Sequence, residues 1–165
     1  MQSVDDVVEA VKSYGCPFVC ITGGEPLLQP DVNPLMTKLC DLGFTVSLET
    51  SGDKDCIEVD PRVKKIIDIK TPDSGEAGKF NVNNLNFKNT NTEYKFVICS
   101  ENDFDWSVEF SSVNNLFNTN LVLFSPSHGK ISPQWMAKKI LSTKAPARLQ
   151  LQIHKYIWDE HLRGV

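Results

Sequence analysis

The sequence Cys-Ile-Thr-Gly-Gly-Glu-Pro at residues 20–26 decides the fold. An apolar run over residues 18–21 ends there in two glycines, an acid and a proline. Proteins of the α/β class bind ligands where apolar parallel strands end, at their carboxyl edge. Glycine lets the backbone approach a ligand closely, and the carboxylate of Glu25 suits a ligand ammonium group. The stretch therefore predicts a strand followed by a binding turn; a strand-to-helix turn with an incidental acid is the competing interpretation.

Outward from this stretch, the apolar residues alternate between helical and strand periodicity. We expect helices at 3–14, 30–42, 103–116 and 133–143, and strands at 18–22, 44–50, 63–70, 93–99, 121–124 and 148–154. The apolar run at 18–22 predicts a strand covered on both faces. The asparagine-rich stretch 80–91 predicts an irregular segment or one helical turn, and we interpret 81–91 as a solvated connection. Strands that alternate with helices indicate βαβ units with a parallel sheet. We therefore predict an α/β fold, a partial (β/α) barrel with a mainly parallel sheet, in one domain over residues 1–165.

Composition restricts the class of protein. The 165 residues carry a net charge of −4, which argues against a nucleic-acid partner because phosphate binding needs clustered Lys and Arg. No apolar run approaches the roughly 20 residues of a membrane helix, so no membrane partner is expected. The acidic N-terminus does not resemble a signal peptide. Five cysteines without regular spacing favour free thiols in a reducing cytoplasm.

Polar residues follow four of the predicted strands, at 22–25, 49–52, 68–72 and 125–129. Such faces point either at solvent, on an open sheet, or at a shared ligand site in a barrel lumen. Because four strands share the pattern, we favour the ligand site.

Six motifs together resemble one enzyme family. They are Thr-Gly-Gly-Glu-Pro at 22–26, Glu-Thr-Ser-Gly at 49–52, Asp-Ile-Lys-Thr-Pro at 68–72, Tyr-Lys-Phe-Val at 94–97, Leu-Gln-Ile-His-Lys at 151–155 and Arg-Gly-Val at 163–165. In this order they resemble the 7-carboxy-7-deazaguanine synthases, radical S-adenosylmethionine lyases of queuosine and deazapurine biosynthesis, a tRNA modification pathway. The resemblance covers nearly the whole chain.

The resemblance implies ring contraction of 6-carboxy-5,6,7,8-tetrahydropterin to 7-carboxy-7-deazaguanine with loss of ammonia. It also implies a homodimer, a 4Fe-4S cluster and Mg²⁺. By the family pattern, Gly24 and Glu25 would hold the methionine end of the cofactor S-adenosylmethionine. Glu49, Thr50 and Ser51 would lie beside the cofactor, and Asp68, Ile69 and Lys70 would contact its nucleoside. The pterin substrate would be contacted by Thr22, Gln152, His154 and the carboxylate of Val165.

The sequence departs from the family at the cluster. The loop Cys-x3-Cys-x2-Cys is not present: Cys16 and Cys20 have the first spacing, but Gly23 stands at the third position. A cubane cluster needs three converging thiolates, so we interpret Cys16 and Cys20 as core thiols and assign no catalytic or metal-binding residue. The first barrel strand, the cluster loop and the magnesium ligand would precede residue 1. We expect this segment to be truncated, supplied by a second polypeptide or naturally lost.

Two other functions remain open. A chain without a cluster that keeps the pocket would bind S-adenosylmethionine or a pterin without catalysis, and the chain alone is expected to be inactive. An unrelated nucleotide-binding α/β domain would need a phosphate-binding glycine loop, and neither G-x-G-x-x-G nor a P-loop occurs in the sequence. We therefore rank the unrelated domain last.

Overall fold

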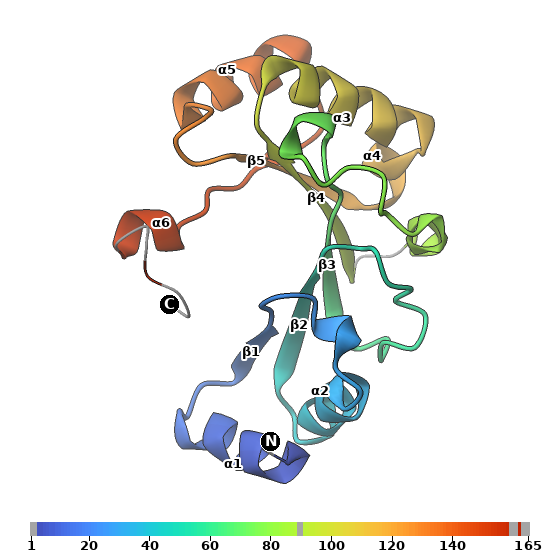
Figure 1. Ribbon diagram of the computed structural model, residues 1–165, viewed down its shortest axis with the longest axis vertical. Coiled ribbons are helices and arrows are strands. Elements are labelled where there is room, and N and C mark those ends of the chain that lie inside the picture. Colours follow the sequence, from blue (N-terminus) through green and yellow to red (C-terminus); the bar gives the residue numbers. More distant parts are fainter. Residues whose placement is uncertain (1–2, 89–90, 159–161, 163–165) are drawn as a thin grey trace. The chain divides into compact units, whose positions relative to one another are not determined.

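The computed structural model describes residues 3–88, 91–158 and 162, and its strands form an open parallel sheet (Figure 1). The strands follow one another in chain order: β1 (Phe18–Ile21), β2 (Thr45–Thr50), β3 (Lys64–Asp68), β4 (Thr92–Ile98), β5 (Leu121–Pro126) and β6 (Arg148–Leu149). The pairs β1–β2, β2–β3 and β5–β6 are parallel. The predicted α/β fold with a parallel sheet is confirmed.

The α-helices are α1 (Val4–Ser13), α2 (Val32–Asp41), α3 (Glu101–Val113), α4 (Leu116–Thr119), α5 (Pro133–Thr143) and α6 (His154–Ile157). Three 3₁₀ helices connect them: η1 (Pro26–Leu28), η2 (Pro72–Ser74) and η3 (Val82–Asn86). None of the helices in the described part of the chain has the length and apolar character that crossing a bilayer requires.

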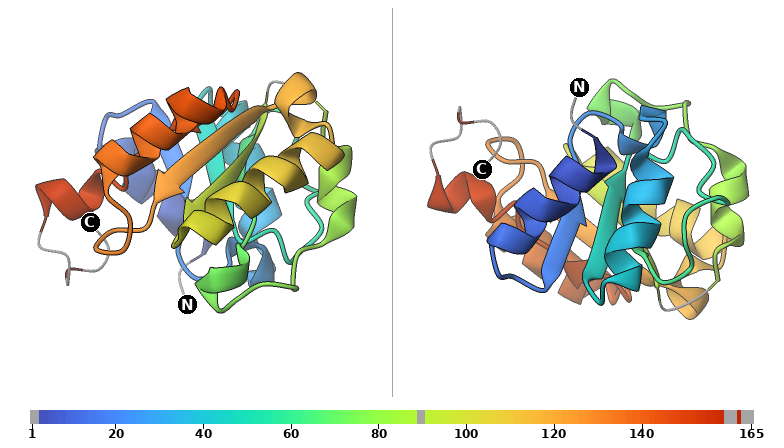
Figure 2. Two further views of the ribbon diagram at one scale, coloured as in Figure 1. Left: turned by 90° about the horizontal axis from the view of Figure 1, so that it is seen from above. Right: turned by 90° about the horizontal axis from the view of Figure 1, so that it is seen from below.

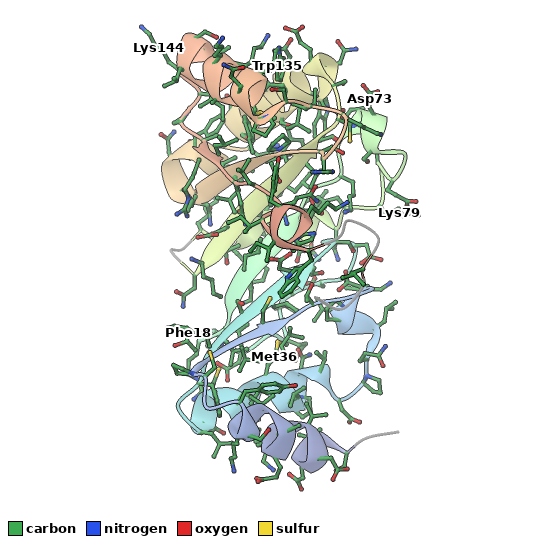
Figure 3. All side chains as sticks on the ribbon, turned by 90° about the vertical axis from the view of Figure 1, so that its left-hand side faces the viewer. Phe18, Met36, Asp73, Lys79, Trp135 and Lys144 are labelled. Atoms are coloured by element: carbon green, nitrogen blue, oxygen red, sulfur yellow. The ribbon has the colours of Figure 1, made fainter. Side chains whose placement is uncertain are left out.

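The chain divides into two compact units, and the first comprises Met1–Asp68 and Lys79–Glu93. In this unit α1 and α2 lie side by side over one face of β1 and β2 (Figure 2, right). Met36 and Leu39 of α2 pack in the core with Val46 and Leu48 of β2, and all four side chains are buried; Met36 is labelled in Figure 3. The predicted capping box of α1 is present.

Strand β1 is less covered than its sequence predicts. Its four residues alternate between exposed and half-buried, and Phe18 is 70% exposed. Cys16 and Cys20 are exposed free thiols, so the prediction of two core thiols is wrong, as is that of a strand covered on both faces. The physical reason is position: β1 ends the strand order and pairs only with β2 among the described strands.

The second unit comprises Ile69–Gly78 and Tyr94–Val165. Helices α3 and α5 lie over the same face of β5 (Figure 2, left). An aromatic cluster fills its core: the ring of Phe124 on β5 meets Phe96 at 5.8 Å and Phe104 at 5.3 Å, and Phe104 meets Trp135 of α5 at 6.0 Å, all edge-to-face. The buried rings of Phe104 and Phe124 and the half-buried ring of Trp135 thus hold α3 and α5 on the strands of this unit.

The predicted strand over 148–154 is mostly wrong. Strand β6 contains only Arg148 and Leu149, and the chain turns into α6 at His154. The alternation of Gln150, Gln152 and His154 therefore does not place them on one strand face. After Gln150, whose N–H donates to the carbonyl of Phe124, no ladder partner holds the segment extended in the described residues.

Candidate functional site

The carboxylate of Glu25 is the centre of a hydrogen-bonded cluster in the first unit. Its Oε1 accepts from the N–H of Leu27 at 3.1 Å and from the Thr50 hydroxyl at 2.8 Å. Its Oε2 accepts from the N–H of Ser51 at 2.8 Å and from the Ser51 hydroxyl at 2.6 Å. Donors from η1 and from the end of β2 therefore fix this carboxylate at the carboxyl edge of β1.

Thr50 and Ser51 reach Glu25 because β1 and β2 are parallel neighbours with Ile21 opposite Leu48. Thr50 is buried on the same face of β2 as Leu48, whereas Glu49 is half-buried on the opposite face. The predicted cofactor residues 49–51 are thus split between two faces of the strand, and two of them contact Glu25.

Gly52 continues this edge in a tightly enclosed left-handed turn. It has φ of +73°, and a Cβ placed on it would lie 2.8 Å from the side chain of Ile67 and 3.0 Å from the ring of Phe80. Its N–H donates to the Thr50 hydroxyl at 3.2 Å. Only glycine fits here without displacing a neighbour.

Asn84 holds the same turn from the opposite side. Its amide donates to the carbonyls of Gly52 at 3.1 Å and Lys54 at 2.8 Å, and its oxygen accepts from the N–H of Cys56 at 2.9 Å. Asn84 is completely buried. The prediction of a solvated connection over 81–91 is wrong at this residue, because its side chain replaces backbone pairing for residues 52–56.

The remaining predicted cofactor residues lie at other places along the chain. Gly24 has φ of +54° and open space around its Cα. Asp68, half-buried, ends β3 in the first unit, while Ile69, buried, and Lys70, half-buried, begin the second unit.

A second hydrogen-bonded carboxylate, that of the buried Asp103, organises the loop that follows these residues. It accepts from the Thr71 hydroxyl and from the N–H groups of Asp73 and Cys99, each at 2.9 Å. Asp103 is fully buried in the first turn of α3. Sequence reasoning missed it, although Ser100 and Asp103 have the capping-box spacing that correctly predicted the start of α1.

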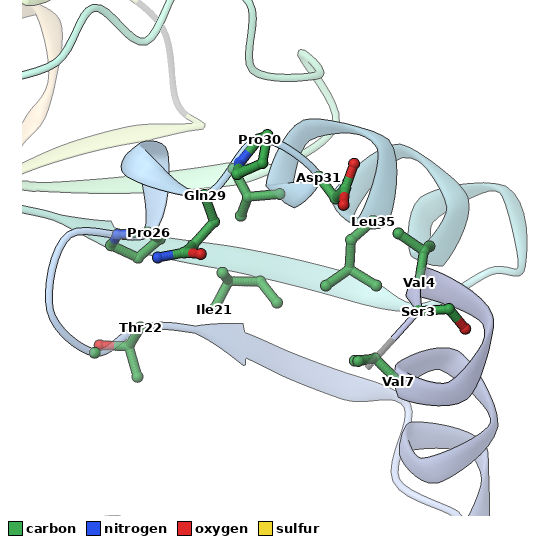
Figure 4. A pocket seen from close by; sticks show the side chains of 12 residues that line it. Ser3, Val4, Val7, Ile21, Thr22, Pro26, Gln29, Pro30, Asp31 and Leu35 are labelled. Carbon is green, nitrogen blue, oxygen red and sulfur yellow. The ribbon is translucent and has the colours of Figure 1, made fainter. Parts of the chain in front are cut away.

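The predicted substrate residues are only partly placed. Thr22 is exposed and lines a largely apolar groove of 420 Å³ with Val7, Ile21 and Leu35 (Figure 4). In the second unit, Gln152 accepts from the N–H of His128 at 3.3 Å, and His154 is exposed on α6. Val165 lies outside the described residues.

The residues that the structure describes do not fit an iron–sulfur cluster. Within residues 3–88, 91–158 and 162, no three His, Cys, Asp or Glu side chains lie together so that they could hold a metal ion. Cys56 is buried, and burial raises the pKa of its thiol to about 12; burial also raises the pKa of Cys40. A thiol that resists deprotonation is a poor metal ligand, because the ligand is the thiolate.

The amino-acid sequence is similar to curated proteins over almost its full length. It is 38% identical over 168 residues to the 7-carboxy-7-deazaguanine synthase of Chlorobaculum tepidum, covering 99% of this chain and 76% of that protein. This chain belongs to the 7-carboxy-7-deazaguanine synthase family. No family model matches it.

Two solved structures share the fold. QueE from Escherichia coli superposes with a TM-score of 0.71 at 21% identity, covering 92% of this chain. SuiB from Streptococcus suis, solved bound to S-adenosylmethionine, superposes with a TM-score of 0.60 at 13% identity, covering 91% of this chain. The chain spans 64% of the QueE chain and 41% of the SuiB chain. The family membership predicted from the six motifs is confirmed.

Proposed function

We propose that the chain binds S-adenosylmethionine at the edge formed by the ends of β1 and β2, as part of a 7-carboxy-7-deazaguanine synthase. The observation that carries the proposal is the Glu25 carboxylate, which η1 and the end of β2 fix beside Gly24, a glycine with open space at its Cβ position. A fixed carboxylate next to an open glycine suits the ammonium and carboxylate end of an amino acid. SuiB, which shares the fold, was solved with this cofactor.

The fixed groups would bind and orient the cofactor. Gly24 and Glu25 would hold its methionine end, Glu49, Thr50 and Ser51 would lie beside it, and Asp68, Ile69 and Lys70 would contact its nucleoside. Thr22, Gln152, His154 and the Val165 carboxylate would contact the pterin. When bound, S-adenosylmethionine supplies the radical chemistry of the reaction.

The family suggests the substrate, the product, the cellular location and the oligomeric state. We propose 6-carboxy-5,6,7,8-tetrahydropterin as substrate and 7-carboxy-7-deazaguanine as product, in the cytoplasm, with residues 1–165 acting as one core domain of a homodimer. The family resemblance implies a 4Fe-4S cluster and Mg²⁺, and the described residues lack ligands for a cluster. We therefore propose that this chain alone is inactive, with the cluster segment truncated, supplied by a second polypeptide or naturally lost.

Replacing Glu25 with alanine tests the proposed cofactor site. We expect the full chain to bind S-adenosylmethionine in a calorimetric titration, and Glu25→Ala to raise the Kd by about tenfold or more, since a charge-assisted hydrogen bond is lost. Glu9→Ala, which removes an exposed acid of α1, is the matched control and should leave the Kd unchanged. Equal affinity of Glu25→Ala and the unaltered chain would contradict the site.

A second candidate is a binding module that holds the cofactor without catalysis. The scattered placement of the potential metal ligands among the described residues favours it. Iron and sulfide analysis after anaerobic reconstitution tests the premise that both candidates share, namely that this chain holds no cluster by itself. We expect no stoichiometric iron in this chain; about four irons per chain would contradict our interpretation of its cysteines and favour a complete synthase.

A further inference from the structure

The four hydrogen bonds to Glu25 leave no position for a ligand. A carboxylate has about four acceptor positions, two on each oxygen. Leu27 and Thr50 occupy those of Oε1, and the N–H and hydroxyl of Ser51 occupy those of Oε2. An ammonium group can therefore bind Glu25 only if one of these four donors is displaced.

Three of the donors are held in place. The N–H groups of Leu27 and Ser51 belong to the backbone of η1 and of the segment that follows β2. The Thr50 hydroxyl is buried and also accepts from the N–H of Gly52 at 3.2 Å, so its rotation would leave that donor without its acceptor. Displacement of any of these three would break backbone structure or a second hydrogen bond.

The Ser51 hydroxyl is different because it has a second acceptor. Its oxygen lies 2.6 Å from Oε2 of Glu25 and 3.0 Å from Oδ1 of Asp53. A serine hydroxyl carries one hydrogen, so it donates fully to only one of these carboxylates. Asp53 is 29% exposed at its side chain, and its other oxygen lies 3.6 Å from Nζ of Lys54.

We propose that Asp53 is a positioning residue of the cofactor site, which takes over the Ser51 hydroxyl when the ligand ammonium binds Oε2 of Glu25. Rotation about the Ser51 side chain opens one acceptor position on Glu25. The hydroxyl then donates to Asp53, so no donor is left without an acceptor. This inference rests on the proposed binding of S-adenosylmethionine, and it adds Asp53, which sequence reasoning did not select.

A double-mutant cycle tests the role of Asp53, with calorimetry of S-adenosylmethionine binding to the full chain. Asp53→Ala removes the second acceptor and should raise the Kd by about tenfold. Ser51→Ala removes the competing donor and should lower the Kd a few-fold. In the Ser51→Ala background, Asp53→Ala should have no further effect, because there is no hydroxyl to take over.

Two further measurements separate positioning from folding. 5′-Methylthioadenosine has no ammonium group, so Asp53→Ala should leave its Kd unchanged, whereas a general disturbance of the edge would weaken both ligands. Asp53→Asn keeps an acceptor oxygen and should retain most of the affinity. Glu58→Ala, at an exposed acid in the same connection, is the control for charge alone.

The outcomes distinguish this inference from the proposed function. If the unaltered chain does not bind S-adenosylmethionine, both are wrong. If the unaltered chain binds and Asp53→Ala has the same Kd, the role of Asp53 is wrong and the cofactor site stands. The same holds if Asp53→Ala still weakens binding in the Ser51→Ala background.

Discussion

Replacement of Asp103 with alanine is expected to lower the free energy of unfolding by about 3 kcal/mol or more. The side chain is completely buried, and three donors end on it: the Thr71 hydroxyl and the N–H groups of Asp73 and Cys99. Without the carboxylate the part-buried N–H groups of Asp73 and Cys99 lose their acceptor, and each then costs its desolvation free energy. The Thr71 hydroxyl keeps a second acceptor, the carbonyl of Val97 at 3.1 Å. Urea unfolding followed by circular dichroism measures the change.

Asp105 provides the matched control for Asp103. It lies on the same helix, its side chain is 63% exposed, and it faces Nζ of Lys139 at 3.5 Å. Asp105→Ala should change the free energy of unfolding by only about 0.5 kcal/mol, because exposed ion pairs contribute little. Asp103→Asn, which keeps one acceptor oxygen, should lie between the two alanine variants. A loss for Asp103→Ala no larger than that for Asp105→Ala would show that the cluster is not stabilising.

Replacement of Gly52 with alanine should destabilise the first unit by about 2–4 kcal/mol, from two separate causes. The residue has φ of +73°, which a side chain tolerates poorly. The added Cβ would also lie 2.8 Å from Ile67 and 3.0 Å from the Phe80 ring, closer than van der Waals contact. Because Gly52 adjoins Ser51, we also expect weaker binding of S-adenosylmethionine.

Gly43→Ala isolates the steric part of this effect. Gly43 has φ of +87°, but a Cβ placed on it would have no neighbouring atom within 4 Å. Gly43→Ala should therefore lower the free energy of unfolding only through its strained backbone, by about 1–2 kcal/mol. The difference between the two variants in urea unfolding should be about 1–3 kcal/mol, which is the cost of overpacking at Ile67 and Phe80. Equal losses would mean that these side chains move aside freely.

Local patterns predicted the helices and strands well, but not what covers them. The Ser-x-x-Asp spacing occurs twice, at Ser3–Asp6 and at Ser100–Asp103. In α1, the exposed carboxylate of Asp6 accepts hydrogen bonds from the N–H and the hydroxyl of Ser3. In α3 the same position is buried, and Asp103 instead binds Thr71, Asp73 and Cys99. The spacing is a local property, whereas two of the three partners of this buried carboxylate lie about 30 residues away in sequence, where only the fold brings them close.

The errors have related causes. The apolar run of β1 predicts burial, but burial depends on a neighbouring element that a strand's own residues do not encode. The alternation after Arg148 predicts a strand, but β6 ends at Leu149 because extended backbone also needs a ladder partner. At the candidate site, the motifs brought together Glu25, Thr50 and Ser51, since parallel pairing aligns the ends of β1 and β2. The motifs did not point to Asp53 and Asn84, because each of these residues acts through hydrogen bonds in a turn, which the sequence pattern does not reveal.

The Asp103 cluster also has a thermodynamic consequence for ligand binding. Thr71 precedes η2, the turn that follows Lys70, and Asp73 lies within it; both residues donate to one buried carboxylate. The conformational entropy of this loop is therefore lost when the second unit folds, before any ligand arrives. A nucleoside that contacts the residues before the loop would meet a surface that is already ordered, so its binding would carry a small entropic penalty from the protein.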